Sequence, residues 1–482
     1  MTQKDWSKAI LEIFGEICRI PRPSGHEEKI GEYLTGFAAK RNLEHLKDNA
    51  GNILIRKQAS PGMENRRTVI LQAHQDMVCE KDAAIEHDFM RDSIETYTEG
   101  GWLKARGTTL GADDGIGIAM ALAVLDDEAI KHGPIECLFT VSEETGLCGA
   151  ENLQPGMMNG NMLINLDSED EGQIFIGCAG GVTTDVTFKF SKESIPDNYF
   201  FIEITVDKLH GGHSGDDIDK GYANANKILA RFLYNTMDKY DIRLCSFNGG
   251  NLHNAIPRCA TARIALPDSF KENIRVDFNI FADIVQKEYH VTETGMEFRM
   301  SSTDRQDYCI DTETSHKLIM SIHSAVNGVF AMSMDIPGLV ETSSNLASVK
   351  TGDGTIKIVA SHRSSVESAI QWISSVYASA FRLAGAEVRT NDAYPGWTPN
   401  TDSELLKISV DTYRRLFGRD PEVRAIHAGL ECGLFLKAYP GLDMISVGPT
   451  LRGVHSPTER LELKTVGMVF DHLLAILEEI PE

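Results

Sequence analysis

Apolar residues follow helical and strand-like periods in alternation over the first third of the chain. Residues 5–20 show helical spacing, and Ser24-Gly25-His26-Glu27 then fits a capping box that opens a second helix over 26–40. Beyond them the pattern predicts buried strands at 52–56, 68–73, 135–141 and 162–166, and a helix at 115–130. Apolar strands separated by helices predict an α/β fold with a mostly parallel central sheet covered on both faces.

The pattern changes at Gly177-Cys178-Ala179-Gly180-Gly181. Longer amphipathic strands and helices follow, and after the turn-rich stretch 391–399 an α/β pattern resumes. The expected elements are strands at 199–206 and 260–266, helices at 222–238 and 365–384, then helices at 403–417, after Gly429 and at 464–479, and a strand at 443–447. We therefore expect one α/β domain, 1–180 and 394–482, interrupted by an inserted α+β domain, 181–393.

Composition narrows the classes of partner. The 482 residues carry 47 Lys and Arg against 70 Asp and Glu, a net charge of −23, with no Lys/Arg stripe. Such a chain repels nucleic acid and anionic lipid, so we expect neither as a partner. The most apolar run, 116–125, is too short for a membrane helix, which needs about 18 residues.

The start of the chain and the cysteines bear on location. Residues 1–10 lack the apolar run of a signal peptide. The nine cysteines are an odd number without a Cys-x-x-Cys pair. We expect reduced thiols and a cytoplasmic protein.

His, Asp and Glu residues, the types that can bind metal ions, follow the predicted strands. In open α/β sheets ligands bind outside the carboxyl ends of the strands. The candidates at that edge are His74 and Asp76 after 68–73, Glu143 and Glu144 after 135–141, Asp167 after 162–166, His455 after 443–447, and Asp113 in a Gly-rich loop that enters a helix. So many carboxylates would repel one another without cations, and nitrogen plus oxygen ligands without thiolate suit Zn²⁺, and also Co²⁺ or Mn²⁺. Two ions that share one carboxylate would use the set fully.

Spacing suggests how roles divide. In an extended segment residues i and i+2 face the same way, so Asp76 can accept the second ring N–H of a metal-bound His74. Glu143 and Glu144 point to different sides, so one can bind metal while the other acts as general base toward water. Asp114 and Glu169 stand beside proposed ligands and could exchange roles with them.

These motifs resemble a known family, the co-catalytic dinuclear-zinc peptidases that include carboxypeptidase G, aminoacylase, tripeptidase and carnosinase. The resemblance spans the whole chain. It rests on Leu71-Gln72-Ala73-His74-Gln75-Asp76, Leu110-Gly111-Ala112-Asp113-Asp114-Gly115, Ser142-Glu143-Glu144-Thr145-Gly146, Leu166-Asp167-Ser168-Glu169 and Gly453-Val454-His455-Ser456-Pro457. It implies that His74, Asp113 and Asp167 hold one zinc and that Asp113, Glu144 and His455 hold the other. Asp76 would orient His74, and Glu143 would be the general base.

The same resemblance implies that the inserted domain is a lid through which the protein forms a homodimer. In it, His213 of Gly211-Gly212-His213-Ser214-Gly215 would polarise the scissile carbonyl, and Asn254 would contact substrate. Arg363 would bind the substrate's C-terminal carboxylate, as a guanidinium suits, and Gly429 would line the specificity side. His213 and Asn254 as plain turn residues, and Arg363 as a solvated strand-end charge, remain alternatives.

The implied function is a metal-dependent dipeptidase that hydrolyses Xaa-His and related dipeptides such as β-alanyl-His. Nothing in the composition points to histidine, so this part rests on the resemblance. An N-acyl-amino-acid deacylase or a tripeptidase with the same metal core is the alternative, because fold and metal site do not set substrate choice. A catalytically silent binding protein is a third hypothesis, which the intact ligand set disfavours.

Overall fold

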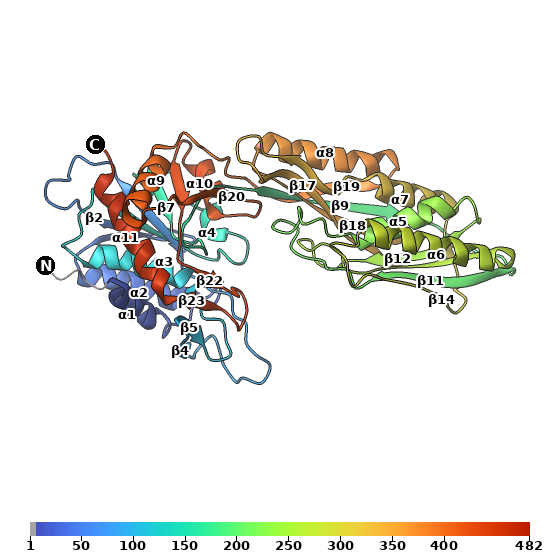
Figure 1. The fold of residues 1–482 in the computed structure, drawn as a ribbon, viewed down its shortest axis with the longest axis horizontal. Coiled ribbons are helices and arrows are strands. Elements are labelled where there is room, and N and C mark those ends of the chain that lie inside the picture. The colour runs from blue at the N-terminus through green and yellow to red at the C-terminus, as the bar shows by residue number, and fades with distance from the viewer. Residues whose placement is uncertain (1–5) are drawn as a thin grey trace. The chain divides into compact units, whose positions relative to one another are not determined.

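The computed structural model describes residues 6–482 and divides into two compact units (Figure 1). Unit 1 comprises the described residues up to Cys178, Trp397–Ala425 and Leu430–Glu482, and unit 2 comprises Ala179–Gly396 and Ile426–Gly429. The sequence placed the changeovers at 180/181 and 393/394, and it did not separate 426–429 from their neighbours. The predicted start of the first helix at residue 5 lies outside the described residues.

Unit 1 is built on a mixed sheet whose central strands are parallel. Its strand order is β1 (Glu44–Lys47), β2 (Ile53–Lys57), β6 (Ile135–Thr140), β3 (Val69–His74), β7 (Met162–Asn165), β21 (Asp443–Ser446), β8 (Gln173–Cys178) and β20 (Glu422–Ile426). Strand β3 pairs in parallel with β6 and β7, and β7 with β21, whereas β1, β2 and β8 pair antiparallel. The predicted α/β class is confirmed, but the sheet is mixed and not mostly parallel as predicted. Parallel pairing is confined to the centre, where β3, β6 and β7 are buried along their whole length as such strands require.

Helices cover this sheet. They are α1 (Trp6–Ile17), α2 (Glu28–Lys40), α3 (Ala112–Asp126), α4 (Cys148–Glu151), α9 (Glu404–Phe417), α10 (Glu431–Ala438) and α11 (Leu463–Glu479). Between Gly115 and Leu125 helix α3 is apolar on all sides, and it is buried between β3 and α1, which holds its N-terminal end at the edge of the sheet. A smaller sheet runs in the order β22 (Leu451–Arg452), β23 (Arg460–Glu462), β5 (Trp102–Ala105) and β4 (Thr96–Glu99).

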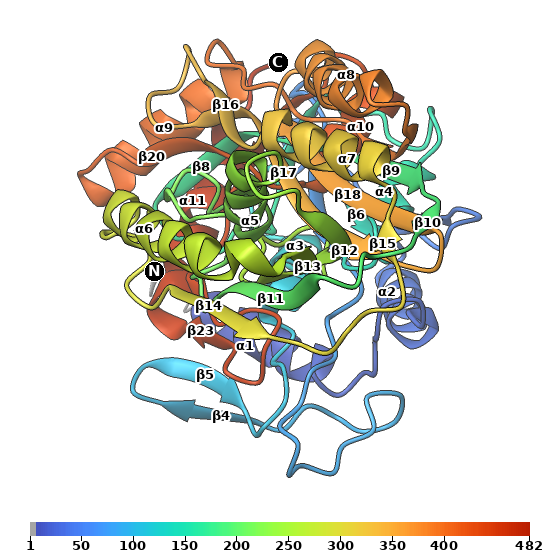
Figure 2. The same ribbon diagram turned by 90° about the vertical axis from the view of Figure 1, so that its right-hand side faces the viewer.

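Unit 2 is an α+β unit on one antiparallel sheet. The order is β14 (Glu297–Ser302), β11 (Tyr199–Asp207), β13 (Ala260–Pro267), β12 (Arg243–Gly249), β17 (Val340–Thr351), β18 (Thr355–Ser364), β9 (Gly180–Lys189) and β19 (Glu387–Tyr394), with β16 (Gly328–Met332) beside β17 and a separate pair β10 (Lys192–Glu193) and β15 (Cys309–Ile310). Helices α5 (Ala225–Thr236), α6 (Lys271–Glu288), α7 (Thr312–Ser324) and α8 (Glu367–Leu383) lie in front of the sheet in Figure 2, with the short η1 (Asp268–Phe270) before α6. Two halves with matching strand order meet where β12 pairs with β17.

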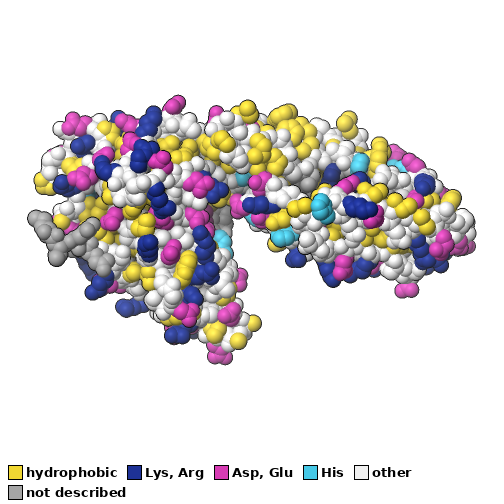
Figure 3. All heavy atoms as spheres, viewed as in Figure 1, with side chains coloured by type: hydrophobic (Ala, Val, Ile, Leu, Met, Phe, Trp, Pro, Cys, Tyr) yellow, Lys and Arg dark blue, Asp and Glu magenta, His cyan; other side chains and the backbone are white. Residues whose placement is uncertain are grey.

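The surface and the thiols agree with the composition. On the face shown in Figure 3, basic and acidic side chains are intermingled on both units. Within residues 6–482, no helix combines the length and the apolar character needed to cross a bilayer. All nine cysteines lie in the described part of the chain, and each is a free thiol.

Candidate functional site

The parallel strands of unit 1 bring the sequence-predicted ligands to one edge of the sheet. His74 is the last residue of β3, Glu143 and Glu144 follow β6, and Asp167 follows β7. His455 comes from the loop between β22 and β23, and Asp113 from the first turn of α3. We call His74, Asp113, Glu144, Asp167 and His455 the rim cluster.

Asp113 lies at the centre of the rim cluster. One of its carboxylate oxygens lies 2.9 Å from His74 Nε2, and the other lies 3.1 Å from His455 Nε2. His455 Nε2 is also 3.0 Å from Glu144, and His74 Nε2 is 3.4 Å from Asp167 Oδ1. Asp113 therefore has one oxygen toward each imidazole, the arrangement of a carboxylate that could bridge two cations.

The neighbouring Asp114 has a different environment. Its oxygens accept the backbone N–H of His74, at 3.3 Å, and of Gly117, at 3.1 Å, and the residue is 1% exposed. Asp114, His74 and Asp167 also stand close enough to hold an ion, as do His74, Asp113 and Glu144. Because its oxygens are engaged with the backbone, Asp114 anchors α3 to β3, and Asp113 is the better candidate ligand.

Asp76 supports His74 from behind. Its Oδ1 lies 3.4 Å from His74 Nδ1, and it accepts the backbone N–H groups of Glu143 and Glu144 and the Ser24 hydroxyl. Burial alone would raise the pKa of Asp76, but His74 and the donated hydrogen bonds lower it to about 2. Asp76 is therefore an anion that can orient the imidazole ring.

Without cations, the closely spaced carboxylates in and beside the rim cluster repel one another. Burial and the neighbouring carboxylates raise the pKa of Asp167 to about 7 and that of Glu143 well above its usual range. Burial lowers the pKa of His74, but Asp167, Asp113 and Asp76 outweigh burial and raise it well above normal. Divalent cations would reverse these repulsions, and imidazole with carboxylate oxygens suits Zn²⁺, Co²⁺ or Mn²⁺. The residues present fit a dinuclear metal site.

The predicted capping box before α2 is wrong. Glu27 occupies the N-cap position but makes no side-chain capping bond. Instead the Ser24 hydroxyl donates to Asp76, at 2.8 Å, and Glu27 Oε1 accepts the backbone N–H, at 2.9 Å, and the hydroxyl, at 2.8 Å, of Ser142. Ser24 and Glu27 thus brace the residues around Glu143, and Glu27 Oε1 also accepts the Gly25 N–H at 2.9 Å. Local spacing does not reveal this competition from distant partners.

Two further residues that the sequence did not single out fix the Asp113 loop. Glu459 accepts backbone N–H groups from the four residues 110–113, at 2.7 to 3.3 Å. Arg22 donates to the carbonyls of Gln75, Asp76 and Gly111. The loop that carries Asp113 is thus tied to the loop that carries Asp76.

A third such residue, Glu431, lies under the site at the start of α10. It is 1% exposed, and its Oε2 accepts from Gln72 Nε2 at 2.7 Å and from Thr140 Oγ1 at 2.8 Å. Burial raises its pKa to about 8. Glu431 therefore stabilises the ends of β3 and β6 as a buried carboxyl group.

In unit 2, Arg363 gathers several of the predicted lid residues, and we call Arg363, His213, Tyr394 and His427 the Arg363 cluster. Arg363 Nη1 donates to the Tyr394 hydroxyl at 2.9 Å, and Nη2 lies 3.5 Å from His213 Nε2. Gly429 lies against the Tyr394 ring. Asn254 joins through its backbone, since its carbonyl accepts the Ser214 N–H at 2.8 Å.

His427 is the neutral member of the Arg363 cluster. Its Nε2 is 2.7 Å from the Ser343 hydroxyl, and burial and the Arg363 charge lower its pKa to about 3. Arg363 itself is 7% exposed. The Arg363 cluster thus presents a nearly buried cation beside the neutral His427, which suits an anionic ligand, while the Asp216 carboxylate lies 3.3 Å from His213 Nδ1.

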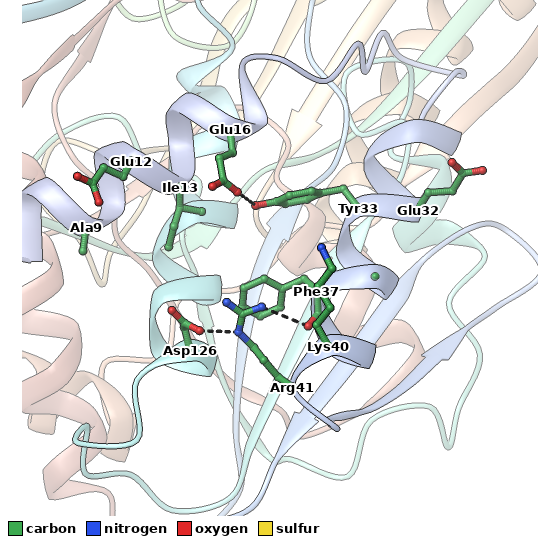
Figure 4. A pocket seen from close by; sticks show the side chains of 11 residues that line it. Ala9, Glu12, Ile13, Glu16, Glu32, Tyr33, Phe37, Lys40, Arg41 and Asp126 are labelled. Atoms are coloured by element: carbon green, nitrogen blue, oxygen red, sulfur yellow. Dashed lines mark hydrogen bonds and ion pairs between the residues drawn. The ribbon is translucent and has the colours of Figure 1, made fainter.

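A pocket of about 510 Å³ elsewhere in unit 1 is a separate feature (Figure 4). Its walls come from α1, α2 and the end of α3, where Asp126 pairs with Arg41. Asp126 closes α3 about 20 Å from Asp113, because each helical residue rises 1.5 Å. Tyr33 donates a hydrogen bond to Glu16 across it, at 2.9 Å.

The chain is similar to known proteins in sequence and in structure. The family profile "Peptidase family M20/M25/M40" matches residues 70–479. The cytosol non-specific dipeptidase of Escherichia coli (strain K12) is 43% identical over 472 residues, 98% of this chain and 97% of that protein. The crystal structure of aminoacylhistidine dipeptidase from Vibrio alginolyticus superposes with a TM-score of 0.93 and 40% identity, covering 100% of this chain and 98% of that one. Aminopeptidase PepT from Bacillus cereus, with a TM-score of 0.58 and 17% identity, shares the fold.

Proposed function

The chain belongs to peptidase family M20/M25/M40, and from this membership we propose that it is a metal-dependent dipeptidase acting on Xaa-His and related dipeptides. The observation that carries the proposal is the rim cluster, with Asp113 between the two imidazoles. The name of the Escherichia coli relative, a non-specific dipeptidase, supports dipeptides as substrates, and that of the Vibrio relative, an aminoacylhistidine dipeptidase, supports the Xaa-His class.

The rim cluster would hold two divalent ions, which we propose to be zinc. His74, Asp113 and Asp167 would hold one, and Asp113, Glu144 and His455 the other. The distances of 2.9 to 3.4 Å between these donor atoms support the grouping. When bound, such ions polarise a carbonyl group and lower the pKa of water.

Glu143 would be the general base. It lies beside Glu144, and Asp76 holds its backbone N–H at 3.0 Å. Burial raises the pKa of its carboxyl group, as suits a group that takes a proton and gives it back near neutral pH. Glu143 would accept the proton of the attacking water and return it to the leaving amine, while Asp76 keeps the His74 ring in one orientation.

Unit 2 would supply the groups that recognise substrate. We propose Arg363 for the C-terminal carboxylate, His213 for the scissile carbonyl, Asn254 for a polar contact and Gly429 for the specificity side. The nearly buried guanidinium of Arg363 and its 3.5 Å approach to His213 support a shared binding surface.

Hydrolysis of a substrate panel tests the proposal. Ala-His, β-alanyl-His, Ala-Ala, N-acetyl amino acids and a tripeptide would be incubated with purified protein and the free amines quantified. We expect cleavage of the dipeptides. Cleavage confined to N-acetyl amino acids or to the tripeptide would instead assign the deacylase or tripeptidase activity.

We also propose a homodimer formed through unit 2, in the cytoplasm. Val276, Ile280 and Ile284 form an apolar stripe along α6, each between 44% and 56% exposed, which supports an association surface. Free thiols and the cytosolic Escherichia coli relative support the location. Sedimentation of the wild-type protein should show a dimer, and Ile280→Glu should shift it to monomer.

A further inference from the structure

A row of three residues crosses neighbouring strands of unit 2. In the sheet register, Gly181 of β9 is directly opposite Arg363 of β18 on one side and Tyr394 of β19 on the other. Directly opposed residues in antiparallel strands project to the same face of the sheet. Arg363, Gly181 and Tyr394 therefore stand in line on one face, with the residue that has no side chain in the middle.

The middle glycine lets the outer two meet. Neighbouring strands lie about 4.8 Å apart, so the backbones at Arg363 and Tyr394, one strand on each side of β9, are about 10 Å apart. The Tyr394 side chain leans over Gly181, and its hydroxyl accepts from Arg363 Nη1 at 2.9 Å. A Cβ at Gly181 would stand 2.6 Å from Tyr394 Cζ and Oη, closer than packed atoms allow. Gly181 has no positive φ, so the ring is what requires glycine here.

Gly429 forms a second wall of the same seat. A Cβ at Gly429 would approach Tyr394 Cε2 to 3.0 Å, and the glycine again has no positive φ. The segment 426–429 belongs to unit 2 although its neighbours on both sides belong to unit 1. Because Gly429 has no side chain, this segment can pack directly against Tyr394.

We propose that Tyr394, seated between Gly181 and Gly429, is a positioning residue that holds the Arg363 guanidinium ready for the substrate's C-terminal carboxylate. The inference rests on the proposed function. Within residues 6–482, Arg363 Nε has no hydrogen-bond partner, and Nη2 lies 3.5 Å from His213. Tyr394 thus fixes one nitrogen of the guanidinium and leaves other donors for a planar carboxylate. Gly429 acts here through Tyr394.

The test compares substrates with and without the carboxylate. Tyr394→Phe keeps the ring in its seat and removes only the hydroxyl, and Ala-His and its C-terminal amide serve as substrates. We expect KM for Ala-His to rise about tenfold, with little change in kcat, because a hydrogen bond to a charged group is lost. The kcat/KM for the amide should stay within about twofold, since the amide offers no carboxylate to the guanidinium.

Tyr199→Phe is the matched control in the same unit, because it removes a tyrosine hydroxyl that bonds Asp241 and not Arg363. It should change kcat/KM for neither substrate. Equal losses on Ala-His and its amide, or no loss on either, would overturn the proposal. If the wild-type protein cleaves N-acetyl amino acids but no dipeptide, the proposed function fails while the same comparison runs on N-acetyl-histidine and its amide.

A stability cycle tests the seat whatever the wild-type protein hydrolyses. Gly181→Ala should lower the melting temperature of unit 2 by several degrees, and Tyr394→Ala should relieve most of that loss because the clash is with the ring. Additive losses in the double variant would show that Gly181 does not seat Tyr394, and would overturn the proposal with it.

Discussion

The rim cluster of unit 1 and the Arg363 cluster of unit 2 handle charge in opposite ways. The rim cluster packs Asp113, Glu144 and Asp167 around two imidazoles, with an excess of negative charge. The Arg363 cluster buries one cation beside His427, whose pKa is lowered to about 3, so that it stays neutral. Each cluster is incomplete by itself. The rim cluster needs cations, which bound metal ions would supply. The Arg363 cluster needs an anion, which a substrate carboxylate would supply.

The largest effect should come from removing the proposed base without disturbing the cations. Glu143→Gln should lower kcat for Ala-His by about 10²–10⁴-fold, because proton transfer by a positioned carboxylate contributes that much. Metal content, measured by plasma emission, should match the wild type. Glu151→Gln, an exposed glutamate of α4, is the control. An active, metal-replete Glu143→Gln protein would exclude this residue as the base.

Removal of metal should separate the two units. Chelation should destabilise unit 1 by about 3 kcal/mol, the stabilisation expected from a ligand at about 100 times its Kd, and leave unit 2 unchanged. Calorimetry with and without chelator, followed by Zn²⁺ addition, measures both. A shift of both transitions, or of neither, would contradict the contrast between the clusters.

Acid should act on unit 2 through its buried neutral histidines. His362 bonds Ser344 and Thr184, and burial lowers its pKa from 6.5 to about 3. Between pH 3 and 6.5 the unfolded chain therefore binds more protons at this histidine than the folded protein does. The free energy of unfolding is unaffected by the protonation of this histidine above pH 6.5 and decreases as the pH falls toward 3. Between pH 8 and 5 the loss should be about 2 kcal/mol. His362→Gln should show a correspondingly flatter dependence in urea unfolding, and an identical slope would refute it.

The smallest effect should come from the support behind Asp113. Glu459→Gln replaces one of two oxygens that accept the N–H groups of residues 110–113. We expect metal affinity to fall about tenfold, as for other groups behind metal ligands. Competition with a chromophoric chelator measures it, with Glu462→Gln as the control. Unchanged affinity would mean that the loop holds Asp113 without this carboxylate.

Local pattern predicted much of this molecule. Apolar strands identified the edge of the sheet, so His74, Asp167 and Glu144 could be placed together before any contact was known. The rest depends on contacts between distant residues. Glu459 bonds Leu110 across a separation of 349 residues, and Gly181 meets Arg363 and Tyr394 only through the register of three strands. Ser24 and Glu27 illustrate the opposite case: their spacing predicts a capping box, but their side chains bond Asp76 and Ser142, which are distant in the sequence.

The most direct test of the central claim is a metal titration of the chelated protein during Ala-His hydrolysis. We expect no turnover without metal and a linear recovery with added Zn²⁺ or Co²⁺ that reaches its plateau at two ions per chain, the number the rim cluster would hold with Asp113 shared. Full activity in the chelated protein, or a plateau at one ion, would contradict a dinuclear site built on Asp113.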